Sequence, residues 1–222
     1  MKGFDWAQKW TRKLSRRAVN IKDTLAEDYP ANEHSHWLRI GVIALILYLL
    51  ITLLLGWYWN EEPEHFDVKA NAMVRADRVV VGSTTVAALV EVVDVLLEKR
   101  GGYLSNDIAP PGIWLDNIPN WEYGALIQIR DFSKAMREAF SRSQSQSTED
   151  QDLALAESRF NFDHNSWIVP ASESEYREGI RYLESYLKRL TDNDEYDAQF
   201  YARADNLRYW LGTLETRLGS LS

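Results

Sequence analysis

Residues 40–59 read IGVIALILYLLITLLLGWYW, twenty consecutive positions without a charged side chain. A helix of this length rises roughly 30 Å, which matches the hydrocarbon core of a bilayer. In lipid a helix also satisfies its own backbone hydrogen bonds, which an irregular segment cannot do. Trp37 on one side and Trp57 and Trp59 on the other supply amphipathic rings that favour the headgroup layer. We therefore predict a transmembrane helix over residues 37–59; the alternative is a buried helix of a soluble core.

The charges that flank this span predict its orientation. Eight basic residues precede it, whereas Glu61, Glu62 and Glu64 follow it directly. Basic flanks stay on the cytoplasmic side of a membrane. The span is also too long and too far from Met1 for an ordinary cleaved signal peptide. We expect an uncleaved anchor in a bacterial inner membrane, with residues 60–222 in the periplasm.

Composition narrows the classes of function. Residues 60–222 carry 28 acidic and 17 basic side chains. Such a surface disfavours nucleic acid, which is bound by basic patches. The chain has no cysteine, which excludes disulfides, thiol nucleophiles and cysteine metal sites. We expect neither a nucleic-acid partner nor a cofactor.

The segment before the span, residues 1–36, is predicted to be a basic amphipathic segment on the cytoplasmic side. Trp6 and Trp10 recur at helical spacing on an apolar face, and lysines and arginines occupy the other faces. A basic helix with tryptophans on its apolar side suits an anionic leaflet, so both tryptophans are candidate membrane-interface residues. The alternatives are a solvated helix and a helix packed on a partner.

The part of the chain after the span predicts a mainly α fold with two regions. Residues 60–170 should form a helical region with an aromatic loop rich in proline and glycine, and residues 171–222 a helical hairpin. Apolar stripes at spacings of three and four predict the helices. These helices are expected at residues 83–100, 121–142, 148–159, 172–190 and 200–218.

The sequence also predicts which residues cap three of these helices and which residues form the apolar face of a fourth. Ser83 or Thr84 should cap the first. Thr148 with Gln151, and Ser172 with Glu175, form capping-box patterns at the starts of two others. On the helix over residues 121–142, the apolar face should consist of Trp121, Ala125, Ile129, Phe132, Met136 and Phe140.

The last two helices have near-heptad stripes joined by a short polar turn, which predicts an antiparallel hairpin, with coiled-coil packing as a further expectation. The second stripe runs almost to Ser222. We expect such a helix to have a partner, either in an oligomer or in a longer chain.

The densest candidate site is the loop over residues 101–124. Aromatic rings beside amides and carboxylates are suited to stacking on a saccharide and bonding its hydroxyls. The candidate ligand- or partner-binding residues are Tyr103, Asp107, Trp114, Asp116 and Trp121, with Asn106, Asn117, Glu122 and Tyr123 nearby. Asp107 and Asp116 could act as an acid and base pair. The alternative is structural: the two tryptophans anchor the core, and the Asp and Asn residues cap turns.

The rest of the sequence contains no motif that indicates a catalysed reaction. The four histidines do not form a metal-binding pattern, and the sequence has no nucleotide-binding glycine loop, nucleophile elbow or zinc-protease helix. We therefore expect no metal site.

Two stretches, GGYLSNDIAPPGIWLDNIPNWEYGALIQIRDFSKAMREAFSRSQSQSTED (101–150) and RFNFDHNSWIVPASESEYREGI (159–180), resemble a bacterial family. It is domain-of-unknown-function family 2333, uncharacterised proteins with a single inner-membrane span. The resemblance implies a membrane-anchored protein that continues past the last helix. It implies no activity and transfers no catalytic residue.

These observations favour a non-catalytic scaffold or interaction module of the cell envelope. Its expected partners are the lipid bilayer and either an unidentified envelope protein or a second copy. The rival hypothesis is a cell-wall saccharide binder or hydrolase that uses Asp107, Asp116 or Glu122. An enzyme requires two carboxylates in one cleft, whereas a scaffold predicts an exposed apolar patch on the hairpin.

Overall fold

The structure, a computed structural model, describes residues 33–143, 148–192 and 197–220. Within these ranges all regular elements are helices, and no β-strand occurs. The prediction of a mainly α fold is thus confirmed. Contacts divide the chain into two compact units, residues 1–51 and residues 52–222, and each is described by itself. The expected amphipathic segment with Trp6 and Trp10 lies outside the described residues.

The first described helix, α2 (Glu33–Trp59), contains the apolar run. Its segment His36–Trp59 has a mean hydropathy of 2.6, and 6% of its apolar window is buried. Trp37 and Trp57, expected at the two interfaces, are 73% and 80% exposed. A helix of a soluble core would bury such a surface, so the alternative of a core helix does not fit. α2 is long and apolar enough to cross a membrane.

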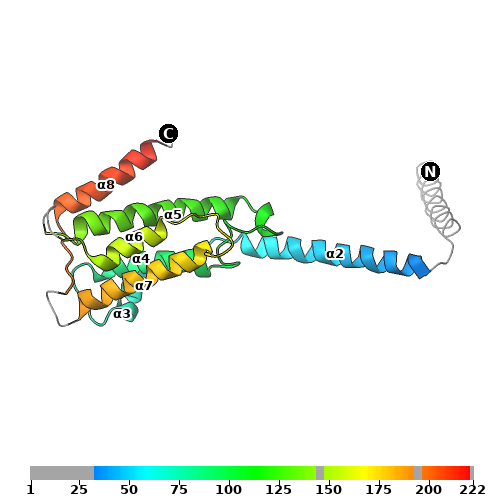
Figure 1. The fold of residues 1–222 in the computed structure, drawn as a ribbon, viewed down its shortest axis with the longest axis horizontal. Helices are drawn as coiled ribbons and strands as arrows, with labels where there is room; N and C mark the ends of the chain where they lie inside the picture. Colours follow the sequence, from blue (N-terminus) through cyan, green and yellow to red (C-terminus); the bar gives the residue numbers. More distant parts are fainter. Residues whose placement is uncertain (1–32, 144–147, 193–196, 221–222) are drawn as a thin grey trace, which may run out of the picture. The chain divides into compact units, whose positions relative to one another are not determined.

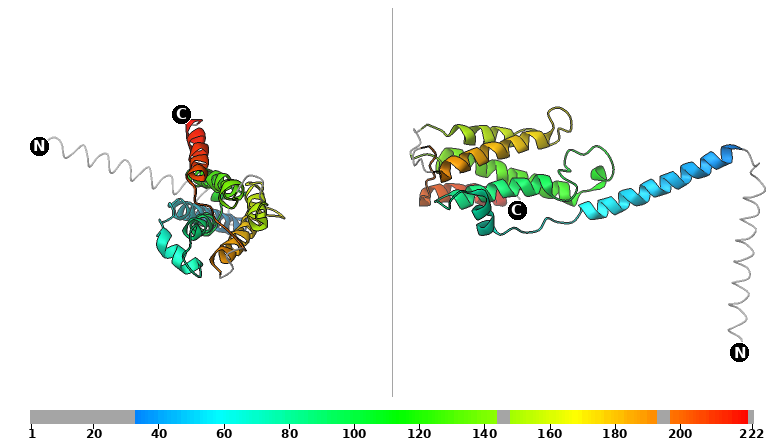
Figure 2. Two further views of the ribbon diagram at one scale, coloured as in Figure 1. Left: turned by 90° about the vertical axis from the view of Figure 1, so that its left-hand side faces the viewer. Right: turned by 90° about the horizontal axis from the view of Figure 1, so that it is seen from below.

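The second unit is a bundle of helices around α4 (Ser83–Glu98). This helix packs against α3 (Val68–Arg75), α5 (Asn117–Ala135) and α7 (Ser172–Thr191). The shorter α6 (Gln151–Phe160) packs against α7 and α5, as the two views in Figure 2 show together with Figure 1. All of these elements contribute to one apolar core.

The stripes predicted for α4 and α7 form much of this core. The buried residues are Val86, Leu89, Val90, Val93, Leu96 and Leu97 of α4, and Tyr176, Ile180, Leu183, Leu187 and Leu190 of α7. A close approach between α6 and α7 depends on Gly179. A Cβ atom there would lie 2.5 Å from Cε1 of Phe160, whose ring is fully buried.

The predicted capping residues are shifted in the structure. α4 follows Gly82, which has a φ of 92°, and the Ser83 hydroxyl bonds the backbone of Val80. α6 is capped by Asp150, which accepts from the amides of its second and third helical residues. Ser172 is the first residue of α7 and donates to the carbonyls of Asp163 and Ser166. The predicted boundaries are close to the observed ones. Of these three helices, however, α6 alone has a side-chain cap, whereas α4 and α7 follow Gly82 and Ala171 without one.

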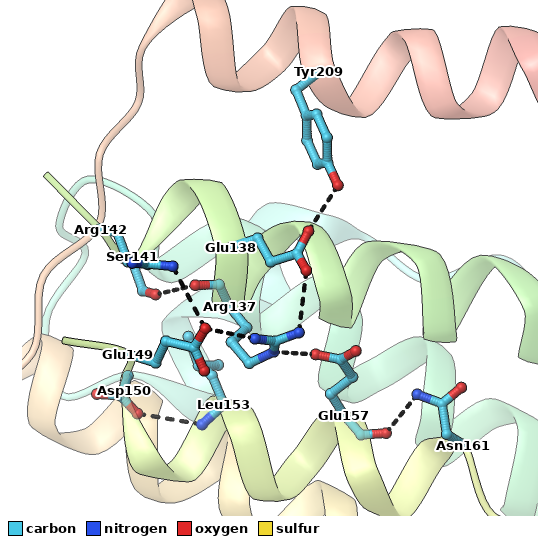
Figure 3. A network of polar contacts seen from close by, with 10 residues as sticks. All are labelled: Arg137, Glu138, Ser141, Arg142, Glu149, Asp150, Leu153, Glu157, Asn161 and Tyr209. Atoms are coloured by element: carbon cyan, nitrogen blue, oxygen red, sulfur yellow. Dashed lines mark hydrogen bonds and ion pairs between the residues drawn. The ribbon is translucent and has the colours of Figure 1, made fainter. Parts of the chain in front are cut away.

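α5 begins four residues before its expected start, at Asn117, and leads into a π-helical turn, η2 (Met136–Phe140). η2 carries a network of charged side chains, drawn in Figure 3. Arg137 is paired with Glu138, Glu149 and Glu157. These partners raise the pKa of the Arg137 guanidinium, chiefly through the hydrogen bond to Glu157. The network joins η2 to α6.

The last described helix, α8 (Ala204–Gly219), is attached differently from the rest. It has no buried residue and packs against α5 and η2. α7 instead packs mainly against α6 and α4. The predicted hairpin of the last two helices is therefore not confirmed, because each has other main neighbours.

Candidate functional site

The candidate loop is organised by a buried ion pair between α4 and α5. Nζ of Lys99 donates to Oε1 of Glu122, and the two side chains are 2% and 0% exposed. Lys99 directly follows α4, and Glu122 lies in the second turn of α5. Lys99 also donates to the carbonyl of Gly102, so its ammonium group has partners on both sides. This pair holds the start of the loop against the bundle.

Glu122 is fully committed to the backbone of that loop. Its Oε1 accepts from the amide of Leu104 at 2.8 Å, and its Oε2 accepts from the amide of Ser105 at 2.7 Å. The Ser105 hydroxyl also donates to Oε2. A buried carboxylate needs such donors to offset its lost hydration. The chemistry of Glu122 is therefore that of a structural anchor, with no oxygen facing solvent.

Burial dominates the electrostatics of this region. It lowers the pKa of the Lys99 ammonium, and the charge of Glu122 partly opposes that effect. Burial also raises the pKa of the Asp107 carboxyl, and the charges of Glu122 and Glu173 act in the same direction. Two carboxylates near one another cannot both ionise without cost.

Tyr103, a candidate ligand-binding residue, is a core residue. It is 4% exposed, and its ring meets that of Tyr176 edge to face with centroids 5.7 Å apart. Its hydroxyl donates to the carbonyl of His164 at 3.1 Å. Burial raises the pKa of Tyr103 well above its usual range. Tyr103 therefore ties the loop to the segment between α6 and α7.

Asp107 and Asp116 are both exposed, and each has its own local neighbour. Asp107 lies over the short helix η1 (Gly112–Trp114), and a Cβ atom on Gly112 would lie 2.2 Å from its Oδ2. Asp116 precedes α5 and accepts from the Asn120 side chain at 2.9 Å, without capping a backbone amide. The expectation that these aspartates cap turns is therefore not met at Asp116.

The two tryptophans are not core anchors. Trp114 is 52% exposed and Trp121 is 37% exposed, which corrects the structural alternative considered for them. On the predicted apolar face, Ile129, Met136 and Phe140 are buried, and Ala125 and Phe132 are partly buried against the core. Only Trp121 differs, because it turns outward while its neighbour Glu122 turns inward. Sequence periodicity missed this, since a charged residue is not expected in a core. Lys99, which directly follows α4, was the one available signal of a partner.

Two cavities of this unit contain none of the candidate ligand-binding residues, although Lys99 lines the first of them. One, of about 340 Å³, is lined by α4 and the segment after α2 and includes Glu62, Glu91 and Asp94. The other, of about 370 Å³, is apolar and is lined by α3, α4, α5 and Trp210 of α8. No group of three or more His, Cys, Asp or Glu residues within the described ranges could hold a metal ion.

Comparison with known proteins gives one match. The family model described as "Uncharacterized protein conserved in bacteria (DUF2333)" matches residues 31–222. No curated protein and no solved structure matches the chain.

Proposed function

Because the chain belongs to the bacterial family DUF2333, whose description names no activity, we propose a function from its own surfaces. We propose that it is a membrane-anchored scaffold of the cell envelope that binds a partner helix through α8. α2 provides the anchor, and the bundle provides the rigid base. The role is non-catalytic.

The observation that carries this proposal is the apolar surface of α8. Leu207, Leu211 and Leu218 are 50%, 52% and 66% exposed, although their spacing places them on one side of the helix. A helix with no further partner normally turns its leucines toward the core of its own domain. Exposed leucines in one stripe are typical of an interaction surface.

The inward side of α8 explains why this stripe stays exposed. Trp210 packs against Phe132 of α5 with ring centroids 4.8 Å apart. Polar contacts at both ends hold the same orientation: Tyr209 donates to Glu138, and Arg217 bonds Asp131. These contacts hold α8 so that the three leucines stay exposed, while Trp210 lines the apolar cavity with α3, α4 and α5.

This combination suits the apolar face of a partner helix. Amphipathic helices bind by placing residues at spacings of three and four into an apolar groove. The partner we propose is such a helix of another envelope protein. Self-association through a second α8 is the alternative outcome of the test.

A photo-crosslinking amino acid at Leu211 tests the proposal in cells. We expect one discrete adduct, and we expect Leu207→Glu to abolish it. The matched control is Leu155, an apolar residue of α6 that is 43% exposed. The same crosslinker at Leu155 should give no adduct. An adduct that survives Leu207→Glu would contradict the proposed surface.

The orientation is part of the proposal and has its own test. The basic residues before α2 and the acidic residues after it support a cytoplasmic N-terminus and a periplasmic bundle in an inner membrane. A reporter that is active only outside the cytoplasm, fused after Ser222, should be active. An inactive fusion of normal abundance would reverse the topology.

The rival hypothesis of a saccharide hydrolase receives no support from the carboxylates. Both oxygens of Glu122 are bonded to the loop, and Asp107 and Asp116 hold separate contacts. Changing Asp107 and Asp116 to Asn should therefore leave crosslinking at Leu211 intact.

A further inference from the structure

One end of the second unit exposes a set of large apolar side chains on two loops. We call this set the apolar rim. It consists of Ile108 (58% exposed), Ile113 (53%), Trp114 (52%), Trp167 (54%), Ile168 (61%) and Val169 (94%). The first three belong to the loop before α5, and the last three to the loop between α6 and α7.

Buried polar contacts hold the two loops together. The side chain of Asn106, which is 6% exposed, donates to the carbonyl of Ser166 and to Glu173, both at 2.8 Å. Tyr103 donates to the carbonyl of His164, whose ring contacts that of Tyr123. The rim is therefore a fixed surface, and Figures 1 and 2 show both loops at the same end of the helices.

The first loop also packs against the end of α2. A Cβ atom on Gly56 would lie 3.4 Å from Cβ of Pro111 and 3.8 Å from Cδ2 of Leu115. Thr52, one turn earlier on the same face, is 4% exposed. At 1.5 Å per residue, Thr52 lies about 10 Å along the helix from Trp59. The covered face of α2 thus begins within its apolar segment.

This placement has a direct consequence for the rim. If α2 crosses a bilayer with Trp57 and Trp59 in the headgroup layer, residues beside Gly56 lie at that depth or below it. Interfacial segments bury their apolar side chains about 5–10 Å into the boundary between headgroups and acyl chains. Ile113 and Trp114 lie two and three residues after Pro111, in the same short turn, so we expect them to fall in that layer.

We propose that the apolar rim is inserted into the outer leaflet and seats the bundle on the membrane beside α2. The inference rests on the proposed membrane anchoring by α2. Lipid is the occupant because the loop that carries Ile113 and Trp114 packs against Gly56, a residue of the uncharged run in α2. The exposed charged residues within the two rim loops include Asp107, Asp116 and Asp163, which are acidic, so anionic lipid is not needed for the contact.

The absence of cysteine from the chain makes the test direct. Single-cysteine variants of the full chain can be labelled with an environment-sensitive fluorophore and reconstituted in phosphatidylcholine vesicles. Each variant is measured in two matched vesicle preparations, and the lipids of one preparation carry a nitroxide quencher on the acyl chain near the carbonyl. Ile113→Cys and Val169→Cys probe the rim. Leu50→Cys, within α2, probes the span.

The matched control is Val81→Cys. Val81 is the same residue type as Val169, is 65% exposed, and precedes α4. It lies at the opposite end of that sixteen-residue helix, about 24 Å from the rim end of α4. A label at Val81 should remain in water.

We expect quenching at Ile113 and Val169 several-fold larger than at Val81, and unchanged by raised salt. Quenching at Leu50 with none above the Val81 level at either rim position would overturn the inference while leaving the anchor intact. No quenching at Leu50 would overturn the proposed anchoring. If quenching at the rim positions required anionic lipid, the proposal that apolar side chains hold the rim in the membrane would be overturned.

Discussion

Lys99 and Glu122 form an ion pair in the interior of the bundle, although they are 23 residues apart in the chain and both belong to residue types that normally face water. The pair fixes the end of α4 against the start of α5. Through the amides of Leu104 and Ser105 it also fixes the loop between them. This loop carries half of the apolar rim, so the buried pair supports the surface that we propose meets the membrane.

Glu122→Gln should be strongly destabilising. Breaking a buried pair by removing one charge leaves the other unpaired and costs about 3–5 kcal/mol. Glu98→Gln is the matched control, because the Glu98–Arg177 pair has side chains that are 65% and 55% exposed. Such exposed pairs contribute about 0–1 kcal/mol.

Urea unfolding of the purified chain in detergent, followed by tryptophan fluorescence, measures the loss of stability in both variants. A Lys99→Met and Glu122→Gln double variant should recover part of the loss, and equal losses for Glu122→Gln and Glu98→Gln would contradict the assignment.

Asp107→Asn should stabilise the fold at neutral pH but not in acid. Burial, with the charges of Glu122 and Glu173, raises the pKa of Asp107 above its ordinary value of 3.8. The folded state therefore binds this proton more tightly than the unfolded state does, and stability falls as pH rises from 3.8 through the folded pKa. The variant removes that penalty, and solvent screening of this exposed side chain keeps the gain small.

Thermal unfolding across pH measures the effect. The gain of Asp107→Asn over the natural chain should be absent below pH 3.8 and should grow above it. Asp116→Asn, at an exposed carboxylate bonded only locally to Asn120, is the control. A gain that does not change with pH would show that charge is not its cause.

Gly179→Ala and Gly124→Ala should change stability in opposite directions. A Cβ atom at Gly179 would meet the Phe160 ring at 2.5 Å, and overpacking of this kind costs about 1–3 kcal/mol. A Cβ atom at Gly124, within α5, meets nothing within 4 Å. Alanine there should gain about 0.5–1 kcal/mol through lower backbone entropy in the unfolded chain. Denaturant unfolding of both variants and the natural chain measures the change in the free energy of unfolding. A Gly179→Ala variant as stable as the natural chain would show that α6 and α7 can move apart without loss of stability.

Tyr209→Phe combined with Arg217→Met should loosen α8 without weakening the core. Each change removes a polar contact, to Glu138 and to Asp131, typically worth about 0.5–1.5 kcal/mol. Hydrogen exchange should become faster in α8 and stay unchanged in α4. Thr213→Val, which removes a bond within α8 itself, is the control. Faster exchange throughout the bundle would contradict the peripheral attachment of α8.

Helical periodicity predicted α4 and α7 well because their stripes are continuous and aliphatic, as in Val86, Val90, Val93 and Leu97. Side chains at spacings of three and four share a face whatever the partner is. The same reasoning missed one position of α5, where Trp121 is exposed and the charged Glu122 is buried. It could not separate α7 from α8 either, since both have leucine stripes and only one of them is covered.

The sequence by itself did not predict the short helix α3, but it determined the apolar span of α2, the helical class of the fold and the approximate limits of the five later helices, α4 to α8. These depend on local quantities: the length of an uncharged run, the spacing of apolar residues and the position of turn formers. Only the tertiary structure decided that Lys99 pairs with Glu122, that Tyr103 is buried while Trp114 is exposed, and that α7 packs on α6. These outcomes depend on which surfaces meet, because a buried charge is tolerated only where a distant segment supplies its partner.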